Sequence, residues 1–265
     1  MPHIVCCVKQ VPDPETPASQ FKVDEAAKVV LPVPGIAPVP SQFDSIGVEA
    51  ALRIRDAVGD TTITILSVGP DSYRDVIKHS LAMGADEGVL INDPSLQEAD
   101  HWLTAQVLAA AITKLQPFDI VICGRQAVDW DMGVVGSTIA ELLGIPCLTI
   151  AKDIQYKDGK LLVERVLLDG FETVESSTPC MVTVSNELGE PRYPQLRQIM
   201  AAARKEVKVW QASDLGLEAP QLANRVSLER LYVPQTEVQC EFIEGETAQE
   251  QAEKLALRLR EAKLI

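Results

Sequence analysis

Short apolar runs alternate with segments of helical periodicity through the first half of the chain, and this alternation limits the folds that the chain can adopt. The apolar runs are too continuous for a sheet with one face in water, so we expect helices on both faces. Strands and helices in this order predict right-handed crossovers and a doubly wound, mostly parallel α/β sheet. The expected strands are residues 3–8, 61–67, 87–92, 118–123 and 180–184, and the expected helices are residues 43–57, 73–83 and 101–115 and one that starts near Gly136.

The character of the chain changes after Ile150. Asp158-Gly159 is a strong hairpin turn signal, and it lies between the strand-like runs 154–156 and 161–168. Residues 1–205 are therefore expected to form one α/β domain with a β-hairpin, and residues 206–265 a long C-terminal arm with a terminal helix. From the pattern alone, the arm either embraces another chain or folds back on its own domain.

The terminal helix is expected to begin at Thr247, because Thr247 and Glu250 have the spacing of a capping box. Its apolar positions follow one another in steps of four and three, which places them on one stripe that faces a partner surface. These positions are Ala248, Ala252, Leu255, Leu259 and Ala262.

Acidic residues outnumber basic ones, since 38 Asp and Glu against 24 Lys and Arg give a formal net charge of −14. Affinity for nucleic acid depends on cations that neutralise phosphates, so general nucleic-acid binding is not expected. A locally basic docking patch remains compatible with this charge.

The six cysteines form no CxxC pair and have no metal-ligand spacing with the three histidines, so we expect structural thiols and no metal site. The N-terminus lacks a basic leader followed by a long apolar stretch. No run approaches the roughly 20 apolar residues of a membrane span. The expectation is a cytoplasmic protein in a reducing compartment, without a transmembrane segment.

Residues 124–136 join an expected strand to an expected helix through a loop that carries glycines and two acids. Backbone N–H groups at a helix start can hold an anion, and Gly133 permits close approach of a ligand. Asp129 and Asp131 can then turn away from a phosphate to cap N–H groups or to hold the shape of the loop. On spacing alone, nucleotide binding and an ordinary strand-to-helix connection both remain open.

No catalytic constellation stands out in the sequence, since there is no nucleophile elbow and no cluster of histidines. The neighbouring Glu164 and Arg165 are expected on the return strand of the hairpin, where they form either a cross-strand ion pair or a pair that faces a partner. The absence of an acid–base or nucleophile set favours a carrier or binding subunit over a hydrolase.

Residues 186–205 open with turn residues and continue as a helix whose apolar positions are surrounded by cations. An apolar anchor ringed by charge is typical of a transient interface. The alternative is a helix that packs its apolar side on its own domain. The residues concerned are the apolar Leu196, Ile199, Met200 and Ala203 and the basic Arg192, Arg197, Arg204 and Lys205.

In this order and with similar spacing, several segments resemble the small (beta) subunit of electron transfer flavoproteins, and the resemblance runs over nearly the whole chain. The matching segments are VCCVKQVPD, SQFDSIGVEAALRIRD, LSVGP, LAMGAD, CGRQAVDWD, VERVLLDGFET and NELGEPRYPQLRQIMAAARK. The last of these is the most specific, because it is similar to the partner-recognition loop of the family.

The resemblance implies an adenine-nucleotide-binding α/β domain whose C-terminal arm embraces a larger alpha subunit. It implies a redox-active FAD held mostly by that subunit, and AMP or a second FAD in the site of this chain. Leu196 corresponds to the leucine that inserts into a dehydrogenase, and Glu164 and Arg165 match a pair near the intersubunit flavin. The implied nucleotide contacts are Cys7, Ser41, Asp44, Val68, Gly124, Gln126, Asp129, Asp131, Met132, Gly133, Val134 and Val135.

The chain departs from the family pattern at the start of the glycine-bearing helix. Conventional members carry Asn-Gln-Thr before the glycine that is Gly136 here, and bifurcating members carry Thr-Ala-Gln-Val over residues 132–135. Gly133 and Val135 favour the second pattern, although Val134 lacks its amide. Trp130 either stacks on a ring of the nucleotide or packs within the loop.

Three functions follow from these observations. The first is an electron carrier that serves acyl-CoA dehydrogenase-type flavoenzymes with AMP in its own site. The second is the FAD-binding subunit of an electron-bifurcating complex that oxidises NADH. The third, which needs no large partner, is a stand-alone nucleotide-binding sensor.

Overall fold

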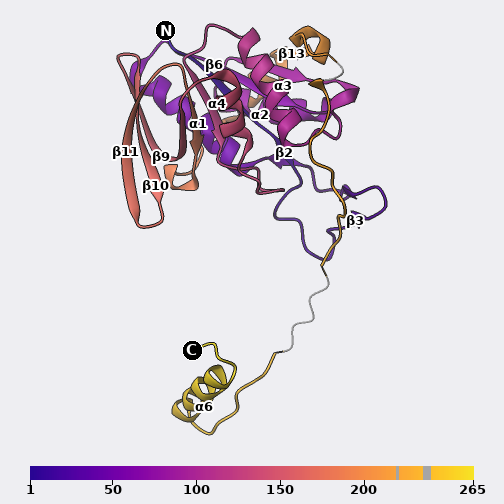
Figure 1. Ribbon diagram of the computed structural model, residues 1–265, viewed down its shortest axis with the longest axis vertical. Coiled ribbons are helices and arrows are strands. Elements are labelled where there is room, and N and C mark those ends of the chain that lie inside the picture. The colour runs from indigo at the N-terminus through magenta and orange to yellow at the C-terminus, as the bar shows by residue number, and fades with distance from the viewer. Residues whose placement is uncertain (219–220, 235–239) are drawn as a thin grey trace. The chain divides into compact units, whose positions relative to one another are not determined.

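The computed structural model describes residues 1–218, 221–234 and 240–265, and it divides into two units, Met1–Leu231 and Tyr232–Ile265. Among the described residues, the larger unit holds a nine-stranded sheet in the order β11-β10-β9-β12-β8-β1-β6-β7-β13 (Figure 1). The strands are β1 (His3–Cys7), β6 (Thr62–Val68), β7 (Glu87–Ile91), β8 (Ile120–Gly124), β9 (Cys147–Lys157), β10 (Lys160–Leu167), β11 (Gly170–Ser177), β12 (Cys180–Val184) and β13 (Val207–Trp210).

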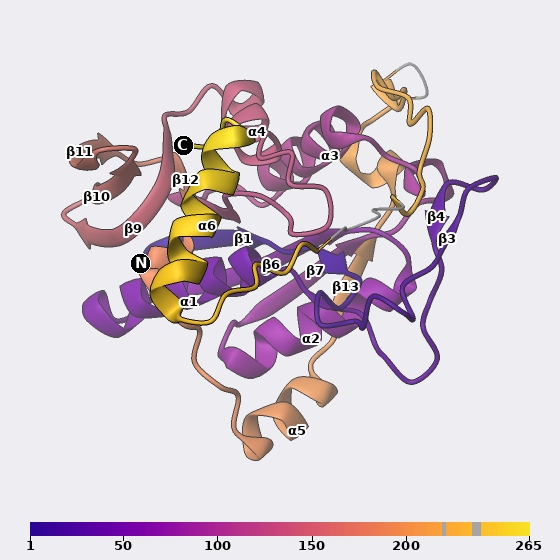
Figure 2. The ribbon, with the colours of Figure 1, turned by 90° about the horizontal axis from the view of Figure 1, so that it is seen from below.

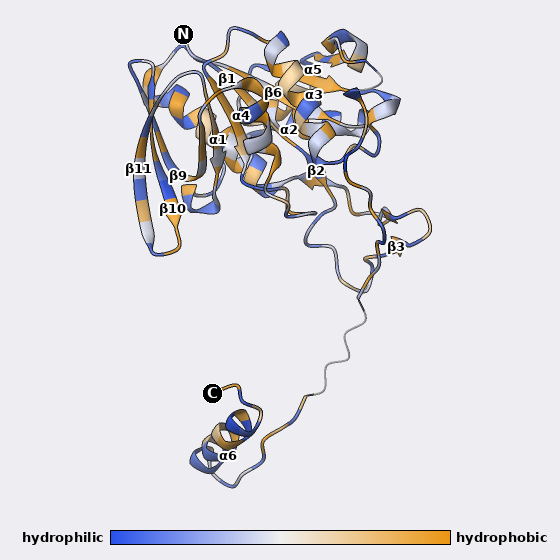
Figure 3. Ribbon diagram, in the orientation of Figure 1, coloured by the Kyte–Doolittle hydropathy of each residue, from blue (hydrophilic) through white to orange (hydrophobic). Residues whose placement is uncertain are grey.

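Helices cover both faces of this sheet, with α1 and α2 on one side and α3 and α4 on the other (Figure 2). Successive residues of β1 enter opposite cores, since Ile4 packs among residues of α1 and α2 and Val5 packs among residues of α3 and α4. A strand buried on both faces needs apolar residues at every position, which explains the continuous apolar runs (Figure 3). The helices of this unit are α1 (Gln42–Val58), α2 (Arg74–Met83), α3 (His101–Lys114), α4 (Val135–Leu143) and α5 (Leu196–Arg204).

The direction of strand addition reverses at β1, which pairs in parallel with β6 on one side and with β8 on the other. The chain first builds outward through β6 and β7 and then crosses back to β8 and β12. This is the doubly wound, mostly parallel topology expected from the sequence, and it is confirmed. In such sheets, ligands bind beyond the carboxyl ends of the strands at the point of reversal.

The hairpin signal at Asp158-Gly159 is also confirmed, because β9 and β10 pair in antiparallel register on either side of it. Both turn residues have positive φ, 51° and 76°, as the favoured two-residue hairpin turn requires. The antiparallel region is larger than expected, since β11 pairs with β10 as a third strand.

Two further parts of the fold differ from the sequence expectations. Val207–Trp210, expected in the arm, forms β13, which pairs in parallel with β7 at the edge of the sheet, and the compact unit continues to Leu231. The connection between β1 and α1 contains two small antiparallel pairs. They are β2 (Gln10–Val11) with β5 (Val39–Pro40), and β3 (Val23–Asp24) with β4 (Val29–Val30).

The smaller unit contains the predicted terminal helix, α6 (Ala248–Glu261). The Thr247 hydroxyl accepts a hydrogen bond from the Glu250 N–H at 3.2 Å, so the N-cap is confirmed. The return bond differs from a capping box, because the Glu250 carboxylate accepts from the N–H of Glu246. No described helix is long and apolar enough to cross a membrane.

Candidate functional site

The carboxyl ends of β1 and β8 lie side by side at the point of strand reversal, and the loops that leave them meet at Asp44. One carboxylate oxygen of Asp44 accepts the N–H of Lys9 at 2.9 Å, and the other accepts the N–H of Gly124 at 3.0 Å. Asp44 is buried, and it lies in the first turn of α1. It therefore ties the loop after β1 to the loop after β8.

Burial raises the pKa of Asp44 to about 7, although the two N–H donors oppose this shift. The position of Gly124 is equally constrained. A Cβ atom there would lie 2.5 Å from the Asp44 carboxylate and 2.9 Å from the backbone carbonyl carbon of Phe43. Only glycine allows the start of α1 to approach β8 this closely.

Ser41 precedes α1 and is fully buried, but its side chain does not cap the helix. Its N–H donates to the carbonyl oxygen of Lys9 at 2.9 Å. Its hydroxyl is the one buried side-chain polar atom without a hydrogen-bond partner among the described residues. A buried hydroxyl without a partner is rare and costly, so the hydrogen-bonding capacity of this oxygen is unused within the described residues.

The loop from Arg125 to Val134 keeps its shape through its two acids. Asp131 accepts the Gln126 amide at 2.8 Å and has a φ of 51°, and Gly133 follows with a φ of 64°. Asp129 forms an ion pair with Lys9 at 2.6 Å, which connects this loop to the one that leaves β1. These contacts correspond to the second role considered for the two acids, holding the loop.

Within the described residues, no side chain caps the N-terminus of α4, whose N-cap residue is Val134. The first N–H groups of a helix have no partner inside the helix, so the amides near Gly136 can donate to an anion. Gly136 is buried, and a Cβ atom there would lie 2.6 Å from Cγ2 of Thr183. The helix start is thus pressed against β12.

The remaining predicted nucleotide contacts lie around the same strand ends. Cys7 is the last residue of β1 and is buried, and Val68 is the last residue of β6. A hydrogen bond with Cys7 and burial raise the pKa of the Cys123 thiol, so Cys123 stays protonated. Trp130 and Met132 are 51% and 53% exposed, which leaves both available to a ligand or to another chain.

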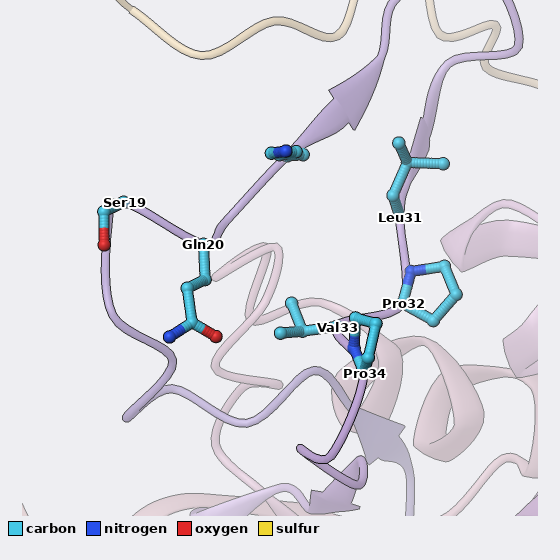
Figure 4. A pocket seen from close by; sticks show the side chains of 7 residues that line it. Ser19, Gln20, Leu31, Pro32, Val33 and Pro34 are labelled. Atoms are coloured by element: carbon cyan, nitrogen blue, oxygen red, sulfur yellow. The ribbon is translucent and has the colours of Figure 1, made fainter.

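Two hollows of the structure lie away from these strand ends, on the connection between β1 and α1. The one in Figure 4 encloses about 360 Å³, with Ser19 and Gln20 on one side and Leu31 to Pro34 on the other. The second encloses about 210 Å³ and shares Leu31, Pro32 and Val33 with the first. None of the predicted nucleotide contacts lines either hollow.

The predicted docking residues lie on or next to α5 with their apolar side chains outward. Leu196, Ile199 and Met200 are 73%, 49% and 56% exposed. Ala202 is the residue of this helix that packs into the core. The alternative from the sequence, a helix with its apolar side on its own domain, therefore does not describe these three residues. Arg197 is exposed, whereas Arg192 is engaged with α1.

Glu164 and Arg165 each form a cross-strand ion pair, which is the first of the two alternatives that the sequence left open for them. Glu164 pairs with Lys152 of β9 at 3.3 Å, and Arg165 pairs with Glu172 of β11. The Arg165 guanidinium also donates to Thr149, to its carbonyl oxygen at 2.9 Å and to its hydroxyl at 2.7 Å. Both charges are thus held in place on the hairpin.

The sequence does not single out Lys9 and Arg125 at the strand ends, or Glu49 beside the segment that carries α5. Lys9 and Glu49 make contacts with residues at least 35 positions away, and Arg125 stacks over the Phe43 ring at 5.2 Å. Lys9 and Arg125 carried a signal in the sequence, because each lies in a loop at the carboxyl end of an expected strand.

Comparisons with known proteins agree on one family. The profile of the electron transfer flavoprotein domain matches residues 38–215. The caffeyl-CoA reductase-Etf complex subunit CarD of Acetobacterium woodii is 36% identical to this chain, and the match covers 99% of this chain and all of CarD. Over the same shares, the electron transfer flavoprotein subunit beta of Thermoanaerobacterium thermosaccharolyticum is 37% identical. The subunit beta of Megasphaera elsdenii is 38% identical over 83% of this chain and 82% of its own.

Proposed function

The chain belongs to the electron transfer flavoprotein domain family as a beta-type subunit, and on that premise we propose that it pairs with a larger alpha subunit and carries electrons between a flavin and dehydrogenases. From the resemblance to the family we propose an acyl-CoA dehydrogenase-type partner, which would dock on α5. The observation that carries the proposal is the uncapped start of α4, which follows the carboxyl end of β8 at the point of strand reversal.

The residues at this point suit an adenine nucleotide. The N–H groups at the start of α4 would hold a phosphate, helped by the positive end of the helix dipole. Gly133 leaves the backbone open to close approach, and the Ser41 hydroxyl offers a buried polar contact. Asp44 and the Lys9–Asp129 ion pair would keep the two loops around the nucleotide in register.

A bound flavin would supply the redox chemistry, and the residues of this chain would bind, orient and shield it. The hairpin ion pairs of Glu164 and Arg165 would set the charge near the flavin shared with the alpha subunit. We also propose that the protein works in the cytoplasm, where the six free thiols would stay reduced.

A second candidate function is supported by the relative from Acetobacterium woodii, whose name places it in a complex of a reductase with an electron transfer flavoprotein. In this alternative the site of this chain holds FAD, and the complex oxidises NADH by electron bifurcation. Val135 and the small Gly133 fit the sequence pattern of that class better than the conventional one.

Co-expression with the alpha subunit, followed by acid extraction and chromatography of the bound nucleotides, tests the proposal. One FAD and one AMP per heterodimer are expected for the carrier, and two FAD molecules for the bifurcating subunit. A colourless, stable monomer that binds a nucleotide without a second chain would overturn both and support the sensor.

A second test concerns docking. Leu196→Ala should slow electron transfer between the flavoprotein and an acyl-CoA dehydrogenase several-fold or more, because truncation of an exposed apolar anchor removes partner affinity. Flavin content should not change, since Leu196 lies on α5 and not at the strand ends. Unaltered transfer kinetics would contradict the docking role.

A further inference from the structure

The segment that carries Leu196 has almost no core of its own. Between Leu188 and Ala202, both buried, the exposed residues include Tyr193 at 95% and Leu196 at 73%. A helix of nine residues is marginal in isolation, so contacts at its two ends must determine how it is presented.

At the N-terminal end, one carboxylate of α1 holds the chain. The Oε2 atom of Glu49 accepts the backbone N–H of Arg192 at 3.0 Å and its Nε at 2.7 Å. The Oε1 atom accepts from Nη2 of Arg192 at 3.1 Å and from Nε of Arg53 at 3.0 Å. Arg53 in turn donates to the carbonyl oxygen of Leu188 at 2.7 Å, and Arg192 reaches Asp56 at 2.7 Å.

Glu49 is 5% exposed, so its charge is costly unless it is paired. Burial works against ionisation, but hydrogen bonds from Arg192 and Arg53 outweigh it and hold the pKa of Glu49 below its ordinary value. Four donors on one buried carboxylate leave it no freedom to reorient. The backbone at Arg192 is therefore fixed to α1, four residues before Leu196.

At the C-terminal end, a lysine of α2 caps α5. Nζ of Lys78 donates to the carbonyl oxygens of Ala202 at 3.0 Å and Ala203 at 3.1 Å, and to that of Lys205. Lys205 donates to the carbonyl oxygen of Ala85 at 2.7 Å. The segment is thus attached to α1 at its N-terminal end and to α2 at its C-terminal end, with its exposed part between them (Figure 2).

We propose that Glu49 is a positioning residue for partner docking, which fixes residues 189–195 to α1 so that the apolar side of α5 is presented in one orientation. This inference rests on the proposed function, because docking of a dehydrogenase is what the orientation serves. A segment that is already ordered loses less conformational entropy when the partner binds. The anchor therefore raises affinity without any contact with the partner. The partner chemistry that fits is an apolar pocket rimmed by carboxylates, since Arg197 and Arg204 are exposed beside the anchor.

The test uses the heterodimer with its alpha subunit and compares Glu49→Gln with the wild type. Glutamine keeps the volume but loses the charge and one acceptor site. We expect amide hydrogen exchange of residues 189–204 to become at least about ten-fold faster, while exchange in α2 and β8 is unchanged. We expect the apparent KM for an acyl-CoA dehydrogenase, supplied with its acyl-CoA substrate, to rise roughly ten-fold at unchanged kcat.

Two controls separate positioning from general damage. Flavin content and reduction of a small artificial electron acceptor should stay at wild-type values in Glu49→Gln. Glu175→Gln, which removes a glutamate from an exposed ion pair with Lys160 on the hairpin, should alter neither exchange nor KM. If Glu49→Gln does not fold, Arg192→Gln breaks the same link from a more exposed side chain.

Parallel measurement of Leu196→Ala distinguishes the two proposals. If Leu196→Ala raises KM and Glu49→Gln changes neither KM nor exchange of residues 189–204, the anchor is refuted and the docking role stands. If Leu196→Ala has no effect on transfer, the docking role itself fails. In a Glu49→Gln, Arg192→Gln double variant, KM and the exchange rate of residues 189–204 should rise no more than in either single variant, because the two residues act through one link.

Discussion

The contact between Gly136 and Thr183 offers a sharp test of how α4 is positioned. Gly136 is the second residue of α4, and its backbone is pressed against the methyl group of Thr183 on β12. Gly136→Ala would place a Cβ atom 2.6 Å from Cγ2 of that methyl group, about 1 Å closer than ordinary contact. Because Thr183 is β-branched and buried, its methyl group cannot rotate away without loss of other contacts.

Two terms of opposite sign set the magnitude. Overpacking in a tight core costs about 1–3 kcal/mol, whereas alanine is better than glycine in a helix by up to about 1 kcal/mol. Gly136→Ala should therefore lower the free energy of unfolding by about 1–2 kcal/mol. The start of α4 should also shift, so the amides proposed to hold the phosphate would lose alignment and nucleotide content should fall.

Thr183→Ser is the matched rescue, since it deletes Cγ2 and keeps the hydroxyl that accepts the N–H of Ile150 at 3.1 Å. Alone it should cost about 1 kcal/mol for the lost methyl group. In the Gly136→Ala background it should restore nucleotide content, and the double-mutant cycle should give a favourable coupling of about 1–2 kcal/mol. Urea denaturation and nucleotide extraction measure the two effects. Wild-type stability and nucleotide content in Gly136→Ala, or a coupling near zero, would refute the reasoning.

Two other predictions concern the same strand ends. Burial raises the pKa of Asp44 to about 7, so between about pH 4 and 7 the folded protein keeps a proton that the unfolded chain releases. The free energy of unfolding of the wild type, relative to that of Asp44→Asn, should fall by up to about 4 kcal/mol as the pH rises through this window and should then level off. A difference between the two proteins that does not depend on pH would contradict the raised pKa. Val134→Gln should restore a side-chain donor at the N-cap of α4 and tighten nucleotide binding by about 0.5–1.5 kcal/mol in titration calorimetry; unchanged affinity would remove the side chain from the site.

The fold was predictable where short-range patterns determine it. Periodicity located α1 and α3 to within a few residues, and Asp158-Gly159 located the hairpin turn, because these signals act over a few positions. β13 was not predictable in the same way. Val209 is 43% exposed, and the strand lies at the sheet edge, where pairing with β7 through the backbone leaves a weaker pattern in the side chains.

The sequence predicts where the candidate site lies, but it does not predict the contacts within it. The glycine-bearing loop and the strand ends could be inferred from topology, since ligands bind where strand order reverses. The Lys9–Asp129 pair and the Glu49–Arg192 pair join residues separated by 120 and 143 positions. A single sequence does not specify which of its 38 acids meets which of its 24 strongly basic side chains. Arg192 was accordingly assigned to the docking surface, although its guanidinium faces α1.

The proposed phosphate grip explains why a nucleotide is easier to infer from this chain than its identity. Main-chain amides are present whatever side chains occupy residues 133–135, so the departures from the family pattern there would lower the affinity of the proposed site without removing it. A nucleotide that ends at its first phosphate and one that continues to a flavin would share this grip. They would differ only in what lies beyond it, where Trp130 and Met132 are half exposed. Strength and identity are therefore separate properties: Val134→Gln should change the first, and only extraction of the bound nucleotide reports the second.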